Sequence, residues 1–188
     1  MDDKRFFLEN LINGSDGKKI MVFVRTQVRA ERLVKAMQRV GIDSLIIHGG
    51  KGQKERNQAL KKFKEGEGNL LVATDVSARG VDVPGVELVV NYDLPEVAEN
   101  YVHRIGRTGR GNHKGDALSF VSKGEMELLL AIEKFLGKRI PEVKISKKDY
   151  QTVLDLTNEK SLDDLLVQIE FELENNGKKT KKNRKKKK

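Results

Sequence analysis

The sequence predicts an α/β domain with a central, mainly parallel sheet and helices on both faces. Three observations support this fold class. Short β-branched apolar runs alternate with longer segments whose apolar residues recur at helical spacing. The apolar runs are continuous, as in Leu70-Leu71-Val72-Ala73, which is typical of strands covered on both faces. The chain has 188 residues, of which 37% are hydrophobic, and this suits a single core.

Five strands and the first helix follow from these patterns. Thr26 can cap a helix after the first strand, and Gly41 can end it. This helix places four apolar residues on one face: Leu33, Val34, Met37 and Val40. The strands are expected at Lys19–Val24, Ser44–His48, Leu70–Thr74, Leu88–Tyr92 and Ala117–Val121.

Three further helices are expected between and beyond the strands. One runs from about Gln53 to Lys64 and would bury Ala59, Leu60 and Phe63. Ser122 and Glu125 form a capping box for the next, which the sequence places at Met126 to Leu136 before Gly137 and Pro141. The last would start at Ser161 and carry an apolar stripe: Leu162, Leu165, Leu166, Ile169 and Leu173.

The composition excludes several classes of protein. Without cysteine the chain can form neither a disulfide framework nor a thiolate metal site. His48, His103 and His113 stand far apart, so we expect no metal site. The first residues lack the basic start and apolar stretch of a signal peptide, and no apolar run approaches the roughly 20 residues of a membrane span. We therefore expect a cytoplasmic protein without membrane contact.

The formal net charge of +9 is a property of the C-terminus. Residues 177–188 hold nine Lys and Arg residues and no acid, so residues 1–176 are formally neutral. Repelling charges with no apolar residue to bury predict a disordered basic tail. This tail is either a solubilising or added segment or an electrostatic tether to RNA phosphates. Bulk charge therefore gives no argument that the folded part binds nucleic acid.

Three arginines recur every third residue in Tyr101–Gly111, which reads YVHRIGRTGRG. The interleaved glycines permit close approach, so the guanidinium groups of Arg104, Arg107 and Arg110 could gather on one side. Guanidinium stays charged and forms paired hydrogen bonds with phosphate oxygens, which suits a polyphosphate ligand. A solvated basic helical face is the alternative, but two interior glycines would make a poor helix.

The stretch from His103 to Arg110 resembles motif VI of superfamily 2 helicases in its DEAD-box form. This resemblance implies a RecA-like three-layer domain. It also implies that Arg107 and Arg110 are arginine fingers that reach the γ-phosphate of ATP held by another domain. His103 and Arg104 would link the ATP site to interdomain contacts. A finger of this kind is worth about 10³ to 10⁵ in rate.

A second motif, ATDVSARGVDVP at Ala73–Pro84, directly follows a strand, where ligand sites of parallel sheets lie. It resembles motif V of the same family. The resemblance implies that Thr74 and Gly80 contact the RNA backbone and that Arg79 connects the RNA to the ATP side. Asp82 would accept a hydrogen bond from the ATP ribose, with Gly80 also at the ATP site. The alternative is an ordinary surface loop with an acidic and basic pair.

The segment after the second strand is rich in glycine and opens a helix, whose N-terminus attracts anions. It resembles the family segment between motifs IV and V. The resemblance implies that four of its residues grip RNA phosphates: Gly49, Gly50, Gln53 and Arg56. We interpret His48 as structural. A solvated helical face would explain Gln53 and Arg56 equally well in isolation.

The remaining motifs complete the family order, and the resemblance spans roughly Lys18 to Phe120. Val22–Thr26 resembles motif IV, with Arg25 where many relatives carry Asn. Val90–Pro95 fits the family pattern and is interpreted as architectural. The expected organisation is an N-terminal lead-in helix from an interdomain linker, the RecA-like domain, a C-terminal extension with an accessory helix, and the basic tail: 1–17, 18–145, 146–176 and 177–188.

No G-x-x-x-x-G-K-[ST] phosphate loop and no Asp-Glu-Ala-Asp occurs in the sequence. The resemblance therefore implies that ATP and Mg²⁺ are held mainly by an N-terminal RecA-like domain, and that this chain alone is inactive as an ATPase. We expect the monomeric C-terminal half of an ATP-dependent RNA helicase, with single-stranded or short duplex RNA as a partner. The alternatives are a superfamily 2 helicase acting on DNA and a stand-alone basic RNA-binding or chaperone module.

Overall fold

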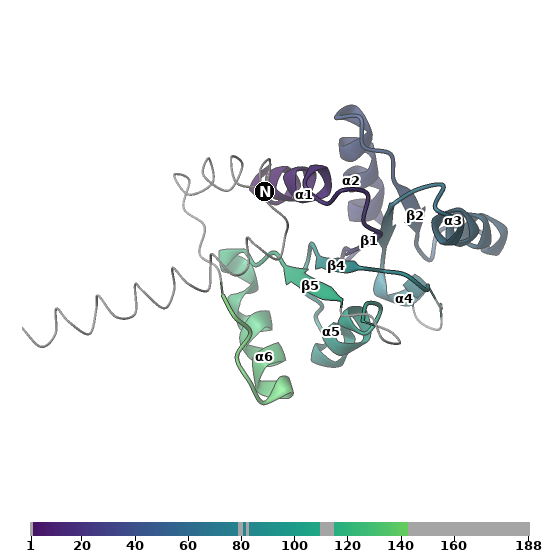
Figure 1. Ribbon diagram of the computed structural model, residues 1–188. Helices are drawn as coiled ribbons and strands as arrows, with labels where there is room; N and C mark the ends of the chain where they lie inside the picture. Colours follow the sequence, from purple (N-terminus) through teal and green to yellow (C-terminus); the bar gives the residue numbers. More distant parts are fainter. Residues whose placement is uncertain (1, 79–80, 82, 110–114, 143–188) are drawn as a thin grey trace, which may run out of the picture. The chain divides into compact units, whose positions relative to one another are not determined.

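The structure, a computed structural model, describes residues 2–78, 81, 83–109 and 115–142. Within these ranges the chain forms a five-stranded sheet in the order β2-β3-β1-β4-β5, with every neighbouring pair parallel (Figure 1). Each strand lies where the sequence predicted one, to within two residues. The strands are β1 (Ile20–Phe23), β2 (Leu45–Ile47), β3 (Leu70–Ala73), β4 (Leu88–Asn91) and β5 (Asp116–Ser119).

The chain forms two compact units. The first consists of Met1–Ile12 and Gly17–Ile140 and contains the sheet. The second consists of Asn13–Asp16 and Pro141–Lys188, and nearly all of it lies outside the described residues. The helix expected from Ser161 and the basic tail belong to that part and stay predictions.

Alternating residues of β1 face the two sides of the sheet, which gives the predicted three layers. Val22 points to the face covered by α1 and α2, where Leu8 and Met37 are buried with it. Phe23 points to the opposite face, where it packs in one cluster with Phe63 and Ala78. The helices are α1 (Asp2–Asn13), α2 (Gln27–Arg39), α3 (Gln53–Glu65) and α4 (Asp75–Ala78).

A smaller apolar cluster joins the last elements of the fold. Leu94 and Tyr101 pack there with Leu129 and Ile132. The elements are α5 (Ala98–Ile105), the 3-10 turn η1 (Lys123–Glu125) and α6 (Met126–Leu136). The predicted capping box is present, since Glu125 Oε2 accepts from Ser122 N (3.0 Å) and Oγ (2.6 Å), and it opens η1 ahead of α6.

Helix α2, which the sequence predicted after the first strand, begins at the expected cap but buries fewer of the expected apolar residues. Thr26 Oγ1 accepts from Arg29 N at 3.2 Å, so Thr26 caps α2. Val40, expected on the buried face, is 42% exposed, because it lies at the C-cap beyond the last helical turn. In α3, likewise, Phe63 is fully buried while Ala59 and Leu60 are only partly buried.

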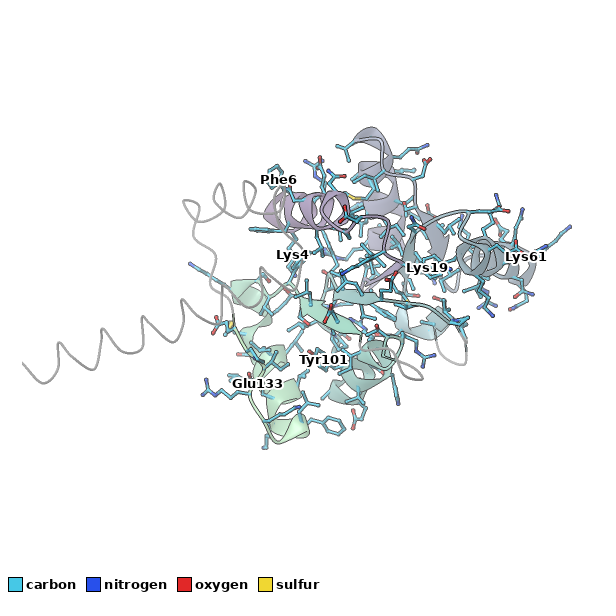
Figure 2. All side chains as sticks on the ribbon, viewed as in Figure 1. Lys4, Phe6, Lys19, Lys61, Tyr101 and Glu133 are labelled. Atoms are coloured by element: carbon cyan, nitrogen blue, oxygen red, sulfur yellow. The ribbon has the colours of Figure 1, made fainter. Side chains whose placement is uncertain are left out.

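The strand register aligns the ends of the strands. Phe23 pairs with both Ala73 and Asn91, and Ile47 also pairs with Ala73. The loops that follow the strands therefore start from one edge of the sheet, which we call the carboxyl edge. Lys4 extends from α1 toward the sheet, and its Nζ donates to Tyr92 O at 2.9 Å just beyond the end of β4 (Figure 2).

Candidate functional site

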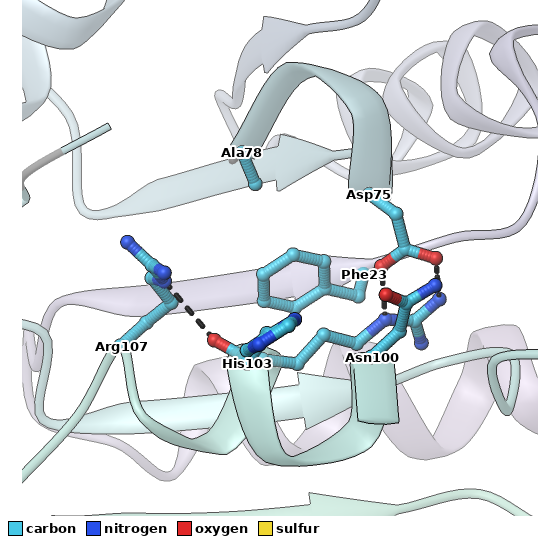
Figure 3. Close-up of a pocket in the computed structure, with 7 residues that line it drawn as sticks. Phe23, Asp75, Ala78, Asn100, His103 and Arg107 are labelled. Atoms are coloured by element: carbon cyan, nitrogen blue, oxygen red, sulfur yellow. Dashed lines mark hydrogen bonds and ion pairs between the residues drawn. The ribbon is translucent and has the colours of Figure 1, made fainter. Parts of the chain in front are cut away.

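A cavity of about 220 Å³ lies at the carboxyl edge, with walls from α4 and α5 (Figure 3). Three of the residues singled out by the YVHRIGRTGRG motif line it. The full lining consists of Phe23, Asp75, Ala78, Asn100, His103, Arg104 and Arg107. Sequence segments that are more than 20 residues apart thus meet at the position where parallel sheets bind ligands.

Arg104 forms a buried part of this wall and donates four hydrogen bonds within the protein. It is only 1% exposed, and Nε and Nη2 donate to the two carboxylate oxygens of Asp75 at 2.6 and 2.9 Å. Nη1 donates to Asn91 Oδ1 at 3.1 Å and to Asp93 O at 2.7 Å. The guanidinium carbon lies 5.1 Å from the centroid of the Phe23 ring. Arg104 therefore ties α5 to the ends of three strands.

Arg107 has a different environment, although it follows Arg104 by only three residues. Its Nε donates to His103 O at 3.1 Å and its Nη1 to Val81 O at 2.7 Å, and the residue is half-buried. Both of these bonds end on backbone carbonyls, whereas Arg104 pairs with a carboxylate. Figure 3 shows the Arg107 side chain across the cavity from Asp75.

Of the arginines expected to gather on one side, Arg104 and Arg107 line one cavity but bind different partners. The helix α5 ends at Ile105, so Arg104 lies within it and Arg107 lies beyond it. His103 is exposed at the cavity. Four further predicted site residues fall outside the described residues: Arg79, Gly80, Asp82 and Arg110.

Thr74, a predicted RNA contact, is buried in a small hydroxyl cluster. Its Oγ1 lies 3.2 Å from Ser77 Oγ, which donates to Ile47 O and to Thr74 O at 2.9 Å each. These bonds fasten the start of α4 to the end of β2. Thr74 thus shapes the loop that carries Asp75, the partner of Arg104.

The other predicted RNA residues lie together after β2. Gly49 and Gly50 are exposed in a turn that leads into α3. On the first turns of that helix, Arg56 Nη2 donates to Gln53 Oε1, and Gln53 Nε2 donates to Asn57 Oδ1 at 2.8 Å. These contacts are among exposed or half-buried side chains, so the structure brings this predicted group to one solvent-facing segment.

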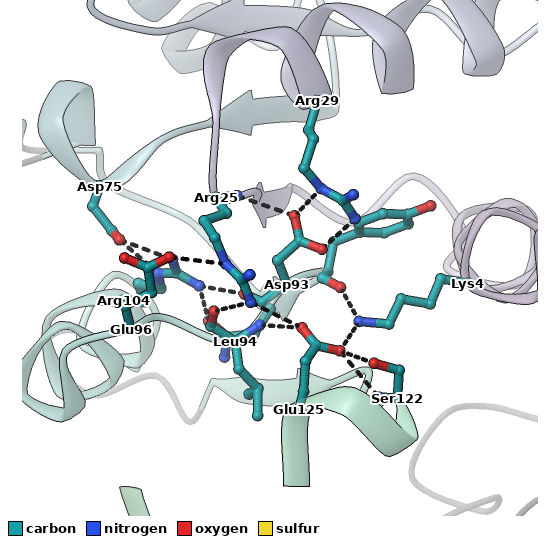
Figure 4. Close-up of polar contacts among 12 residues, drawn as sticks. Lys4, Arg25, Arg29, Asp75, Asp93, Leu94, Glu96, Arg104, Ser122 and Glu125 are labelled. Atoms are coloured by element: carbon teal, nitrogen blue, oxygen red, sulfur yellow. Dashed lines mark hydrogen bonds and ion pairs between the residues drawn. The ribbon is translucent and has the colours of Figure 1, made fainter. Parts of the chain in front are cut away.

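A second set of charged residues at the carboxyl edge centres on Asp93 (Figure 4). Asp93 is buried and accepts from Arg29 Nη2 and Nε at 2.5 and 2.6 Å and from Arg25 N at 3.1 Å. The hydrogen bond with Asp93 raises the pKa of Arg29 further above its usual value, against the opposing effect of burial. Asp93 therefore fixes the start of α2 to the end of β4.

Glu125 extends this network to α1 and α6. Its Oε2 accepts from Lys4 Nζ at 2.5 Å, and its Oε1 accepts from Leu94 N at 3.2 Å. Burial alone would raise the pKa of Glu125, but the hydrogen bonds from Lys4 and Ser122 outweigh it and lower the pKa to about 2. Glu125 is thus ionised and joins the N-terminal helix to the carboxyl edge.

Arg25, the residue that departs from the resembled motif IV, lies at the edge of this network. Its guanidinium is 3.5 Å from Glu125 Oε1, 3.8 Å from Glu96 Oε1 and 3.4 Å from Leu94 O. The side chain is 35% exposed. These distances are longer than those of Arg29 and Arg104, so Arg25 is more loosely held.

Sequence reasoning overlooked several residues of the site. Asp75 lies inside the quoted ATDVSARGVDVP string and directly follows a strand, which was a usable signal. Asn91 and Asp93 lie in the segment interpreted as architectural, and the structure shows both bonded to arginines. Lys4 and Asn100 carried no comparable signal, because neither stands in a recognisable motif or directly after a strand.

The described residues contain no group of His, Cys, Asp or Glu that could hold a metal ion. Among them, also, no helix has the length and apolar character needed to cross a membrane.

Comparison with known proteins extends this picture beyond geometry. The family model described as the helicase conserved C-terminal domain matches residues 3–112. The fold also matches E. coli DEAD-box protein SrmB, in a crystal structure with the regulator of ribonuclease activity A, with a TM-score of 0.70 and 37% identity. That match covers 77% of this chain and 85% of the SrmB chain. The chain belongs to the DEAD-box helicase family, as a C-terminal domain.

Two further relatives show how much of a longer helicase this domain matches. The ATP-dependent rRNA helicase RRP3 of Candida glabrata is 41% identical over 152 residues, 81% of this chain and 31% of that protein. The structure of S. cerevisiae Dbp5 bound to RNA and ADP BeF3 has a TM-score of 0.71 and 36% identity, and covers 84% of this chain and 42% of that one. The DEAD-box domain thus spans about a third of the length of the curated relatives it matches.

Proposed function

We propose that this domain is the C-terminal half of an ATP-dependent RNA helicase. It would supply Arg107 and Arg110 as arginine fingers to ATP bound by a second RecA-like domain, and it would form part of a single-stranded RNA track. The observation that carries the proposal is the half-buried Arg107 guanidinium at the cavity of the carboxyl edge, beside an exposed His103. A guanidinium in that position can reach an anion supplied from outside the domain.

ATP, bound with Mg²⁺ mainly by the second domain, would supply the phosphoryl group that is transferred. Arg107 donates hydrogen bonds to the backbone carbonyls of Val81 and His103, which orient its guanidinium at the cavity. Such a preset cation stabilises the negative charge that develops on the phosphoryl oxygens.

Arg104 acts differently in this proposal, as a positioning residue. Its bidentate pair with Asp75 joins α5, which leads to the finger, to the loop that begins at Thr74. Thr74 and the following residues Arg79 and Gly80 are the RNA contacts that family resemblance implies. The ion pair between Arg104 and Asp75 would therefore keep the RNA loop and the finger in one rigid arrangement.

The relatives support both ligands of this proposal. Dbp5 has been observed with RNA and ADP BeF3, and the RRP3 proteins are described as ATP-dependent rRNA helicases. The lack of a phosphate loop and of Asp-Glu-Ala-Asp in this sequence supports the need for a second domain.

The proposal is tested by measuring RNA-stimulated ATP hydrolysis with the chain alone and with the chain linked to a RecA-like domain that carries both missing motifs. We expect no hydrolysis above background from either domain alone and steady turnover from the linked protein. Turnover by the chain alone at the rate of the linked protein would refute the proposal. RNA binding by the linked protein without hydrolysis would favour a passive RNA-binding module instead.

A further inference from the structure

The buried ring of His48 contacts the turn formed by Gly49 and Gly50. His48 is 5% exposed, and its Nδ1 lies 3.1 Å from Gly50 N while its Nε2 lies 3.0 Å from Glu31 Oε1. A backbone N–H can only donate, so Nδ1 must be the acceptor in this pair. The ring therefore carries its proton on Nε2, which donates to Glu31.

Glu31 on α2 fixes this tautomer. The hydrogen bond from His48 is the main cause that lowers the pKa of Glu31, and Lys51 Nζ adds a second contact at 3.3 Å. Glu31 is therefore an ionised acceptor, which keeps the ring proton on Nε2 and leaves Nδ1 with a lone pair for Gly50 N–H. Helix α2 and the turn are joined through one imidazole.

The turn also fits closely against this support. A Cβ atom built on Gly50 would lie 2.6 Å from Gln27 Oε1 and 3.1 Å from His48 Nδ1. At Gly49 it would lie 3.2 Å from Gln27 Nε2. A side chain at Gly50 would therefore require the Gln27 side chain to move and would press on the His48 ring, while both glycines are exposed elsewhere.

We propose that His48, set in its tautomer by Glu31, is a positioning residue: by accepting from Gly50 N–H it holds the Gly49–Gly50 turn in the shape that meets an RNA phosphate. This inference rests on the proposed RNA-binding function. Two successive glycines lose more conformational freedom on ordering than other residues. A turn that His48 has already ordered loses less freedom when the phosphate binds, so it binds more tightly.

A ring that merely filled space would give a different result on substitution. In His48→Asn the amide oxygen can take the place of Nδ1 and accept from Gly50 N–H, although the contact with Glu31 is lost. In His48→Gln the amide reaches toward Glu31 instead, and the acceptor beside Gly50 is lost. Gln is closer to His in size, so a packing role predicts that Gln is the better replacement, and a positioning role predicts Asn.

The test uses the 188-residue chain, labelled with ¹⁵N, and a single-stranded oligouridylate. RNA affinity is taken from the shifts of the Gly49 and Gly50 amides, because the basic tail can contribute binding of its own. We expect His48→Asn to bind within about twofold of wild type. We expect His48→Gln to bind about fivefold more weakly, which corresponds to about 1 kcal/mol for one hydrogen bond. Glu127→Gln, at an exposed position on α6, is the matched control and should resemble wild type.

Ring ¹⁵N shifts of wild-type His48 provide a second measurement that needs no variant. They should show the proton on Nε2, and a proton on Nδ1 would overturn the positioning role even if a variant failed to fold. Equal affinity of His48→Gln and wild type, or weaker binding by His48→Asn than by His48→Gln, would also overturn it. If the wild-type Gly49 and Gly50 amides do not respond to RNA at all, the proposed RNA contact itself is wrong, and the inference falls with it.

Discussion

Two regions of the carboxyl edge use the same kind of side chain in opposite ways. Around Asp93 and Glu125, cations and carboxylates meet in close pairs, as in the 2.5 Å contact of Arg29 with Asp93. At the cavity, Arg107 is half-buried and donates to the backbone carbonyls of Val81 and His103. The close pairs hold elements together inside the fold, whereas the Arg107 guanidinium is oriented by backbone at a cavity that a ligand can enter.

Arg104 and Arg107, only three residues apart, show the same contrast between a buried ion pair and a cavity residue. Buried Arg104 gives four of its N–H groups to Asp75, Asn91 and Asp93. We therefore expect Arg104 to govern stability and Arg107 to govern catalysis. This division between a stabilising and a catalytic arginine can be tested by substitution.

Replacing Arg107 with Ala in the protein that contains both RecA-like domains should reduce ATP hydrolysis by about 10³ to 10⁵, because the charge on the transferred phosphoryl group loses its cation. RNA affinity and the free energy of unfolding should change little. Steady-state hydrolysis at saturating RNA measures the effect, with Arg39→Ala, at an exposed position on α2, as the control. Equal loss of hydrolysis and RNA binding would contradict the division.

Replacing Arg104 with Met should lower the free energy of unfolding by about 3 to 5 kcal/mol, because the half-buried Asp75 carboxylate loses its buried partner. Urea unfolding of the isolated chain measures this change. Arg107→Met is the matched control and should unfold like wild type. If the two variants proved equally stable, the buried bonds of Arg104 would not have the role assigned to them.

Glu125 should make the fold sensitive to acid. Its pKa is about 2 in the folded protein and 4.5 in the reference state, so its contribution to stability is complete above about pH 4.5 and is lost as the pH falls toward 2. A shift of this size corresponds to about 3 kcal/mol. Unfolding free energies of wild type and Glu125→Gln, measured from pH 7 downward, should converge in acid. Parallel pH curves for the two proteins would exclude this role.

Arg25→Ala should have the smallest effect, below about 1 kcal/mol in the free energy of unfolding, because the side chain is 35% exposed and its ion pairs are long. Arg29→Ala is the comparison, since it removes the close partner of buried Asp93 and should cost more. Urea unfolding of both variants decides the order. A larger loss of unfolding free energy for Arg25→Ala than for Arg29→Ala would show that Arg25 belongs to the buried network.

The sequence predicted which residues meet at the cavity better than how they are bonded there. The spacing of His103, Arg104 and Arg107 indicated a polyphosphate site, and these three residues do line one cavity. Their separate roles could not be predicted, because the partner of Arg104 is Asp75, 29 residues away on another element. Likewise, Thr74 was predicted as an RNA contact from resemblance alone, and no local pattern indicated that its hydroxyl lies in a buried cluster with Ser77.

The sequence by itself determined the five strands, the caps of α2 and α6 and the position of the ligand loops, because these depend on local periodicity and on residues close along the chain. Only the tertiary structure decided which charges are neutralised. Lys4 and Glu125 are 121 residues apart, and Arg29 and Asp93 are 64 apart. Such pairs form because parallel strands bring distant loops to one edge, where burial favours the close pairing of opposite charges.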